Sequence, residues 1–131
     1  MAELVKEIWI DASPDKVFPY LVEPALLTTW IGEESWNEPR PGGRFRLSFP
    51  QSIVRGEFVE IDPPRRVVYT WGREEGDSMP VGSTMVTFEL ELENGGTRVR
   101  LRHDGLPSAQ EVEQHDTGWD HFLPELAKVA A

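Results

Sequence analysis

Two histidines are the residues best placed for chemistry, because each falls on an otherwise apolar face. His103 continues an alternation with Leu101, and His115 shares a helical stripe with Trp119. A buried neutral imidazole can hydrogen-bond a ligand carbonyl or transfer a proton near neutral pH. The alternative is a core histidine whose nitrogens are satisfied by the backbone or by Tyr69. The sequence therefore offers two candidate acid–base groups and leaves both roles open.

Other reactive groups are sparse. Glu111 and His115 are four residues apart, as helical metal ligands can be, but no third ligand is evident. The chain has no cysteine, which excludes disulfides, thiolate metal sites and cysteine nucleophiles. Gly-x-Ser-x-Gly, P-loop and Gly-x-Gly-x-x-Gly motifs are absent from the sequence. We therefore predict no metal, no cofactor and no assigned catalytic residue.

Aromatic residues make a small-molecule pocket the main hypothesis. Most of them point by phase toward one side of the predicted strands and of the C-terminal helix. Aromatic walls with a few polar groups are typical of such pockets, whereas the same rings could instead fill the interior as core. The candidate ligand-binding residues are Trp30, Phe45, Phe49, Phe58, Tyr69, Trp71, Phe88, Leu101, His103, His115, Trp119 and Phe122.

Antiparallel strands must position these side chains. Apolar and polar residues alternate in several segments, which predicts a sheet with one wet and one covered face. The phase of the 53–61 segment is ambiguous, and a bulge near Gly56 would reconcile it. Residues 72–83 form a polar loop that is either a lid at the cavity mouth or a simple hairpin connection. The predicted strands cover residues 5–10, 44–49, 53–61, 67–71, 86–92 and 98–103.

Helices are predicted at two places. Two short helices follow the first strand, the first capped by Ser13 and interrupted by Pro19, and the second beginning at Pro24. A long helix of about 22 residues covers the sheet, beginning after Ser108. Ser108 and Glu111 fit a capping box, Pro124 should bend the helix, and Gly118 allows close approach of a backbone or a ligand.

This order of elements and several short segments resemble the SRPBCC (START-like) superfamily. The resemblance is strongest to the branch named for homologues of the activator of the ninety-kilodalton heat-shock protein's ATPase. It implies an α+β helix-grip fold, in which a curved antiparallel sheet wraps around the C-terminal helix with a cavity between them. Members bind hydrophobic small molecules or lipids, and some relatives cyclise polyketides. The segments that carry the resemblance are 13–18, 24–30, 41–45, 56–65, 69–71, 103–107 and Gly118-Trp119.

Composition bounds the remaining possibilities. The 131 residues fit a single domain, 1–131, and 39% hydrophobic with 27% charged residues is typical of a soluble globular protein. A formal net charge of −10 disfavours nucleic-acid and membrane-surface partners. No run approaches the roughly 18 apolar residues of a membrane helix, and the N-terminus does not read as a signal peptide. We therefore expect a cytoplasmic protein.

Three functions follow as hypotheses. The first is non-enzymatic binding of a hydrophobic small molecule or lipid in the cavity. The second is a polyketide cyclase or dehydratase-type enzyme that uses the same pocket and one of the histidines. The third, from the branch name alone, is a stress-related co-chaperone-like module with a chaperone partner. A homodimer through a free sheet edge is a further expectation.

Overall fold

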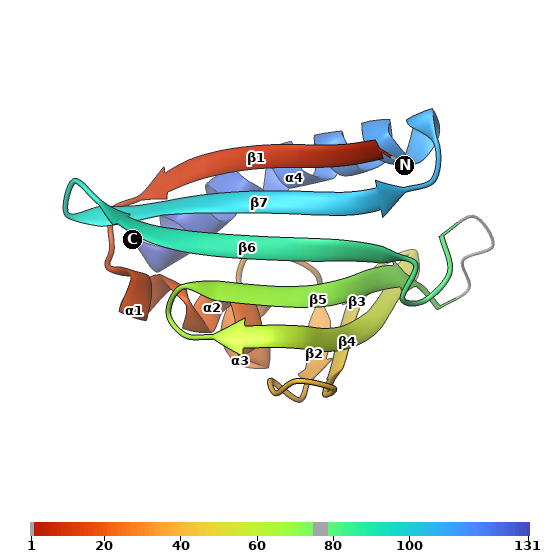
Figure 1. Cartoon of the computed structure of the whole chain (residues 1–131), viewed down its shortest axis with the longest axis horizontal. Coiled ribbons are helices and arrows are strands. Elements are labelled where there is room, and N and C mark those ends of the chain that lie inside the picture. Colours follow the sequence, from red (N-terminus) through yellow and green to blue (C-terminus); the bar gives the residue numbers. More distant parts are fainter. Residues whose placement is uncertain (1, 75–78) are drawn as a thin grey trace.

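Seven strands pair into one antiparallel sheet that curves around a long helix (Figure 1), which confirms the predicted helix-grip architecture. The computed structural model describes residues 2–74 and 79–131. The strand order is β1-β7-β6-β5-β4-β3-β2. The elements are β1 (Ala2–Ile10), α1 (Pro14–Val17), α2 (Pro19–Val22), α3 (Pro24–Leu27), β2 (Glu34–Asn37), β3 (Arg44–Phe49), β4 (Ser52–Asp62), β5 (Arg66–Arg73), β6 (Thr84–Glu93), β7 (Gly96–Leu106) and α4 (Ala109–Ala130).

The register between β6 and β7 places the inward residues of both strands side by side. Val86 lies opposite His103, and Phe88 lies opposite Leu101. All four side chains are buried, as the alternation predicts. The polar β2 was not predicted, because its four residues carry no apolar alternation; it pairs with β3 at the edge of the sheet.

The bulge predicted near Gly56 is wrong in position. The register between β4 and β5 shifts between Phe58 and Glu60, beyond Gly56. Phe58 stays inside, and the extra residue lets Val59, which is 48% exposed, and Glu60 both face outward. Ile61 then returns to the core side of the strand. Gly56 instead allows β4 and β5 to approach closely, because a Cβ at this position would collide with the carbonyl oxygen of Thr70.

Three one-turn helices follow β1, where two short helices were expected. Pro19 lacks an N–H donor, so the first predicted helix divides into α1 and α2 at Phe18. Ser13 caps α1 as predicted, its Oγ accepting from the Lys16 N–H at 3.3 Å. Pro24 opens α3, also as predicted.

The long helix α4 lies behind β1 and β7 in Figure 1 and runs continuously through Pro124. Ser108 caps it, because its Oγ accepts from the Glu111 N–H at 3.1 Å. The reciprocal half of the predicted capping box is wrong, since the Glu111 carboxylate pairs with Arg73 of β5. Lys6 of β1 forms an ion pair with Asp120 of α4 at 2.8 Å.

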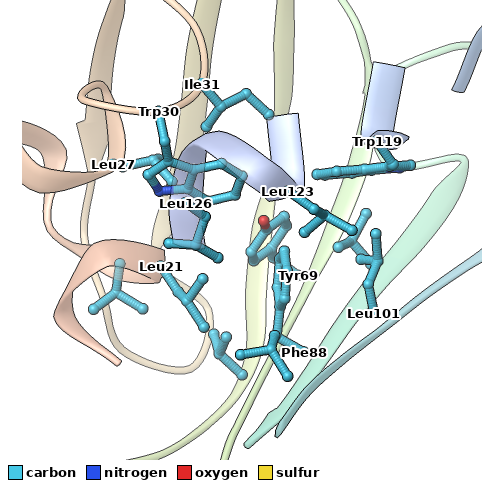
Figure 2. Packing of buried hydrophobic residues seen from close by; sticks show 14 of the residues in the cluster. Leu21, Leu27, Trp30, Ile31, Tyr69, Phe88, Leu101, Trp119, Leu123 and Leu126 are labelled. Carbon is cyan, nitrogen blue, oxygen red and sulfur yellow. The ribbon is translucent and has the colours of Figure 1, made fainter. Parts of the chain in front are cut away.

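The core lies between α4, the short helices and the concave face of the sheet, as Figure 2 shows. None of the helices within residues 2–74 and 79–131 combines the length and apolar composition needed to cross a membrane. The side chains labelled in Figure 2 are Leu21, Leu27, Trp30, Ile31, Tyr69, Phe88, Leu101, Trp119, Leu123 and Leu126.

Candidate functional site

A pocket of about 180 Å³ lies between α4 and strands β3, β4 and β5. A cavity of roughly 150 Å³ holds benzene in another protein, so this one has room for about one substituted aromatic ring. Four aromatic rings, those of Phe49, Trp71, Trp119 and Phe122, belong to its wall. The lining residues are Ile31, Phe49, Ser52, Val54, Trp71, Arg73, Gln114, His115, Gly118, Trp119 and Phe122.

Five of the twelve sequence-predicted residues line this pocket. They come from three elements that are distant in sequence, and Trp71 and Trp119 bring their rings within 5.5 Å of each other. The five are Phe49, Trp71, His115, Trp119 and Phe122.

The other seven predicted residues lie in the surrounding core rather than on the pocket wall. Phe45 stacks on Tyr69 with ring centroids 4.1 Å apart, and Phe58 packs edge-on against both rings. The seven, all buried, are Trp30, Phe45, Phe58, Tyr69, Phe88, Leu101 and His103.

His103 is held in a directed chain of hydrogen bonds. The Trp119 indole N–H, which can only donate, bonds to His103 Nδ1 at 3.1 Å. Neutral His103 therefore carries its proton on Nε2, which donates to Thr84 Oγ1 at 2.9 Å. Thr84 in turn donates to the Trp71 carbonyl at 2.6 Å. Because both nitrogens are engaged, His103 fits the structural role considered for it, with Trp119 and Thr84 in place of Tyr69.

Burial keeps His103 neutral. The side chain is fully buried, and desolvation, followed by the neighbouring His115, lowers the pKa of His103 from 6.5 to about 3. A proton on Nδ1 would also remove the acceptor for the Trp119 N–H. His103 is thus poorly suited to gain and lose protons near neutral pH.

His115 lies on the pocket wall and keeps one nitrogen available. Its Nδ1 lies 2.8 Å from the carbonyl oxygen of Glu111, one turn earlier in α4. A carbonyl can only accept, so Nδ1 carries the proton and Nε2 presents a lone pair. Burial lowers the pKa of His115, and the hydrogen bond to Glu111 partly opposes this.

A partly buried ion pair lies beside the pocket, and Arg73 is one of the lining residues. Arg73, at the end of β5, donates to both carboxylate oxygens of Glu111, at 2.8 and 2.7 Å. The Glu111 side chain is 7% exposed and that of Arg73 is 23% exposed. Such a two-pronged pair is stronger than a single contact and fixes the orientation of both groups.

Sequence reasoning missed the polar part of this wall. Arg73 fell at the start of the predicted 72–83 loop, and its pairing with Glu111 spans 38 residues, beyond any local pattern. Residues 75–78 of that loop, and with them the predicted lid, lie outside the described residues. Gly118 was singled out by its place beside Trp119, and it does line the pocket.

The Glu111–His115 pair considered for a metal acquires no third ligand within the described part of the chain. Among residues 2–74 and 79–131, no group of three or more histidine, aspartate or glutamate side chains could hold a metal ion. Glu111 is instead committed to Arg73.

Comparison with known proteins places the chain in a family. Residues 11–131 match the model of the family described as activator of Hsp90 ATPase homolog 1-like protein. The chain belongs to this family. The AHSA1-like membership confirms the branch that the sequence resembles.

Several solved structures share the fold. The AHSA1-like protein from Rhizobium etli is 35% identical, with 99% of this chain and 82% of that chain covered and a TM-score of 0.75. A protein from Mesorhizobium loti is 24% identical over 97% of this chain and 95% of that chain, with a TM-score of 0.87. The Aha1 dimer from Colwellia psychrerythraea is 22% identical over 99% and 96%, with a TM-score of 0.87. No curated protein matches the chain.

Proposed function

We propose that this AHSA1-like protein binds a small aromatic molecule in the pocket between α4 and strands β3–β5. The observation that carries the proposal is a pocket whose wall holds four aromatic rings beside the polar residues Ser52, Arg73, Gln114 and His115. Burial of apolar surface would drive binding, and the polar groups would orient the ligand.

The expected ligand was a hydrophobic small molecule or a lipid, and the volume of the pocket favours the small molecule. Pockets for drug-sized ligands usually enclose about 300–1,000 Å³, whereas this one has about 180 Å³. A molecule of one ring, or a compact bicycle, fits this volume. A lipid chain would exceed this volume, so we favour the smaller ligand.

The glycine at position 118 supports the proposal that the pocket holds a ligand. Glycine inside a helix costs about 1 kcal/mol relative to alanine. No steric demand explains it, because a Cβ at position 118 would meet nothing within 4 Å. Gly118 lines the pocket, so a larger side chain would occupy the ligand's space. The helix thus accepts an unfavourable residue where the cavity needs room.

Two variants at this position test the proposal. Gly118→Ala and Gly118→Leu both improve helix propensity, but only leucine fills the pocket. We expect toluene, phenol or indole to bind the wild-type protein and Gly118→Ala saturably in NMR titrations, with shifts at the lining residues. Gly118→Leu should weaken binding at least tenfold without losing stability. Absence of saturable binding of all three probes to the wild-type protein would overturn the proposal.

A catalytic role remains a second candidate because of His115. Its Nε2 lone pair faces no hydrogen-bond partner among the described residues, so it could act as a base in a cyclase-type reaction. His103 could not share this role, because both of its nitrogens are engaged. Turnover of a poly-ketone substrate that His115→Gln abolishes would support an enzyme; unchanged substrate would count against it.

The homodimer expected from free sheet edges stays a prediction. β1 and β2 are the outer strands of the sheet, and unpaired edges favour association. The Aha1 protein from Colwellia psychrerythraea is a dimer, which supports the same state here. Light scattering across a range of protein concentrations distinguishes monomer from dimer.

A further inference from the structure

We propose that the ligand carries a neutral hydroxyl group, which accepts a hydrogen bond from the Trp71 indole N–H and donates one to His115 Nε2. The inference rests on the proposed function and names the ligand class, a phenol-like molecule. Both residues line the pocket, and their ring centroids lie 6.4 Å apart.

The Trp71 N–H is the first half of the proposed site. Three tryptophans are buried, and two of them use their N–H groups. Trp30 donates to the Tyr20 carbonyl at 2.8 Å, and Trp119 donates to His103. Trp71 is 4% exposed, yet its N–H has no partner among residues 2–74 and 79–131. A buried donor without an acceptor costs about 1–3 kcal/mol, and a ligand oxygen would recover this energy.

His115 supplies the second half. The bond from Nδ1–H to the Glu111 carbonyl fixes the tautomer, so Nε2 is an acceptor. No hydrogen bond to Nε2 occurs within the described part of the chain. The pocket wall therefore combines a buried, unpaired donor on Trp71 with an acceptor on His115, and its other polar residues are Ser52, Arg73 and Gln114.

Their combination selects among ligand groups. A hydroxyl is the smallest group that both accepts and donates a hydrogen bond. A ketone would satisfy only Trp71, and an ammonium group would satisfy only His115. A carboxylate would meet the lone pair of His115, and the nearby Arg73 is already paired with Glu111. A neutral hydroxyl on an aromatic ring matches both the polar pair and the volume.

Three probes of nearly equal shape test the proposal. Phenol both donates and accepts, anisole only accepts, and toluene does neither. A purely apolar pocket would favour toluene, because burying an unbonded hydroxyl is unfavourable. We expect phenol to bind at least tenfold more tightly than toluene by calorimetry or NMR titration, with anisole between them.

Variants then assign the contacts. His115→Phe should reduce phenol affinity to that of anisole, because only the Trp71 contact is left, while toluene affinity is retained. His121→Phe, at an exposed position on the same helix, should change neither affinity. If toluene binds the wild-type protein as tightly as phenol, the hydroxyl proposal fails and the proposed pocket function stands. If neither probe binds, the proposed function itself fails. The wild-type ratio remains decisive even if a variant does not fold.

Discussion

At the residue scale, His103 is a structural group whose removal should be costly. His103→Phe would leave the Trp119 N–H without its acceptor and Thr84 without its donor. Each unsatisfied buried group costs about 1–3 kcal/mol, so we expect a loss of about 2 kcal/mol or more in urea unfolding. The same change at the exposed His121 should alter stability by no more than about 0.5 kcal/mol. Equal effects at both positions would contradict the assigned hydrogen bonds.

The same histidine should make stability depend on pH. Unfolded His103 gains a proton near pH 6.5, but burial holds its folded pKa at about 3. Its neutral form therefore favours the folded state fully above pH 6.5, and this advantage is lost as pH falls from 6.5 toward 3, by up to about 1.4 kcal/mol per pH unit. His115, whose pKa is also lowered, acts in the same direction.

Urea unfolding of the wild-type protein and His103→Phe between pH 7.5 and 4.5 isolates this contribution. We expect the free energy of unfolding to fall less steeply with acidification in the variant, because carboxylates contribute equally to both proteins. Parallel curves would show that His103 titrates alike in the folded and unfolded states.

Replacing Gly118 should raise the stability of the protein, whereas replacing His103 should lower it. Gly118→Ala removes the conformational freedom of glycine, and its new methyl group meets nothing within 4 Å. We expect an increase of up to about 1 kcal/mol in the free energy of unfolding, measured as a higher urea midpoint. A destabilised variant would mean that the position is more crowded than the structure shows.

At the scale of elements, the Arg73–Glu111 pair fastens the end of β5 to the first turn of α4. Glu111→Gln leaves Arg73 beside a neutral amide, and because Arg73 is partly exposed we expect a loss of about 2 kcal/mol. Glu113→Gln, at an exposed position in the same turn, is the matched control. A similar small effect of both changes in urea unfolding would show that the ion pair adds little.

How well each element could be predicted depended on how far apart in sequence its interacting residues lie. Alternation was sufficient for β6 and β7, because their two faces differ in solvent exposure. The capping serine located the start of α4. The bulge at Val59 was misplaced, since glycine marks close strand approach as readily as a bulge. The polar wall could not be predicted, because Arg73 and Glu111 meet only after the sheet has closed around the helix.

At the scale of the whole molecule, the pocket joins two parts of the fold. α4 lies along β1 and β7 near one edge of the sheet (Figure 1), while β3 and β4 form the opposite part. Phe49 of β3 and Phe122 of α4 approach within 6.0 Å of each other across the pocket. A bound molecule would add contacts to both walls at once.

Amide hydrogen exchange should detect a ligand that contacts both walls of the pocket. With saturating phenol we expect slower amide exchange in residues 49–54 and 114–122 than elsewhere, since binding stabilises the state that binds. Gly118→Leu, with the pocket filled, should show no further change on adding phenol. Uniform slowing over the whole chain would indicate global stabilisation without a local bridge.

The directed chain from Trp119 through His103 and Thr84 also has an evolutionary consequence. Each side chain is useful only while its neighbour supplies the complementary group. A descendant with phenylalanine at position 119 would inherit a histidine whose Nδ1 is buried without a donor. We expect such lineages to exchange the histidine as well, so that positions 103 and 119 vary together when descendants of this chain are aligned.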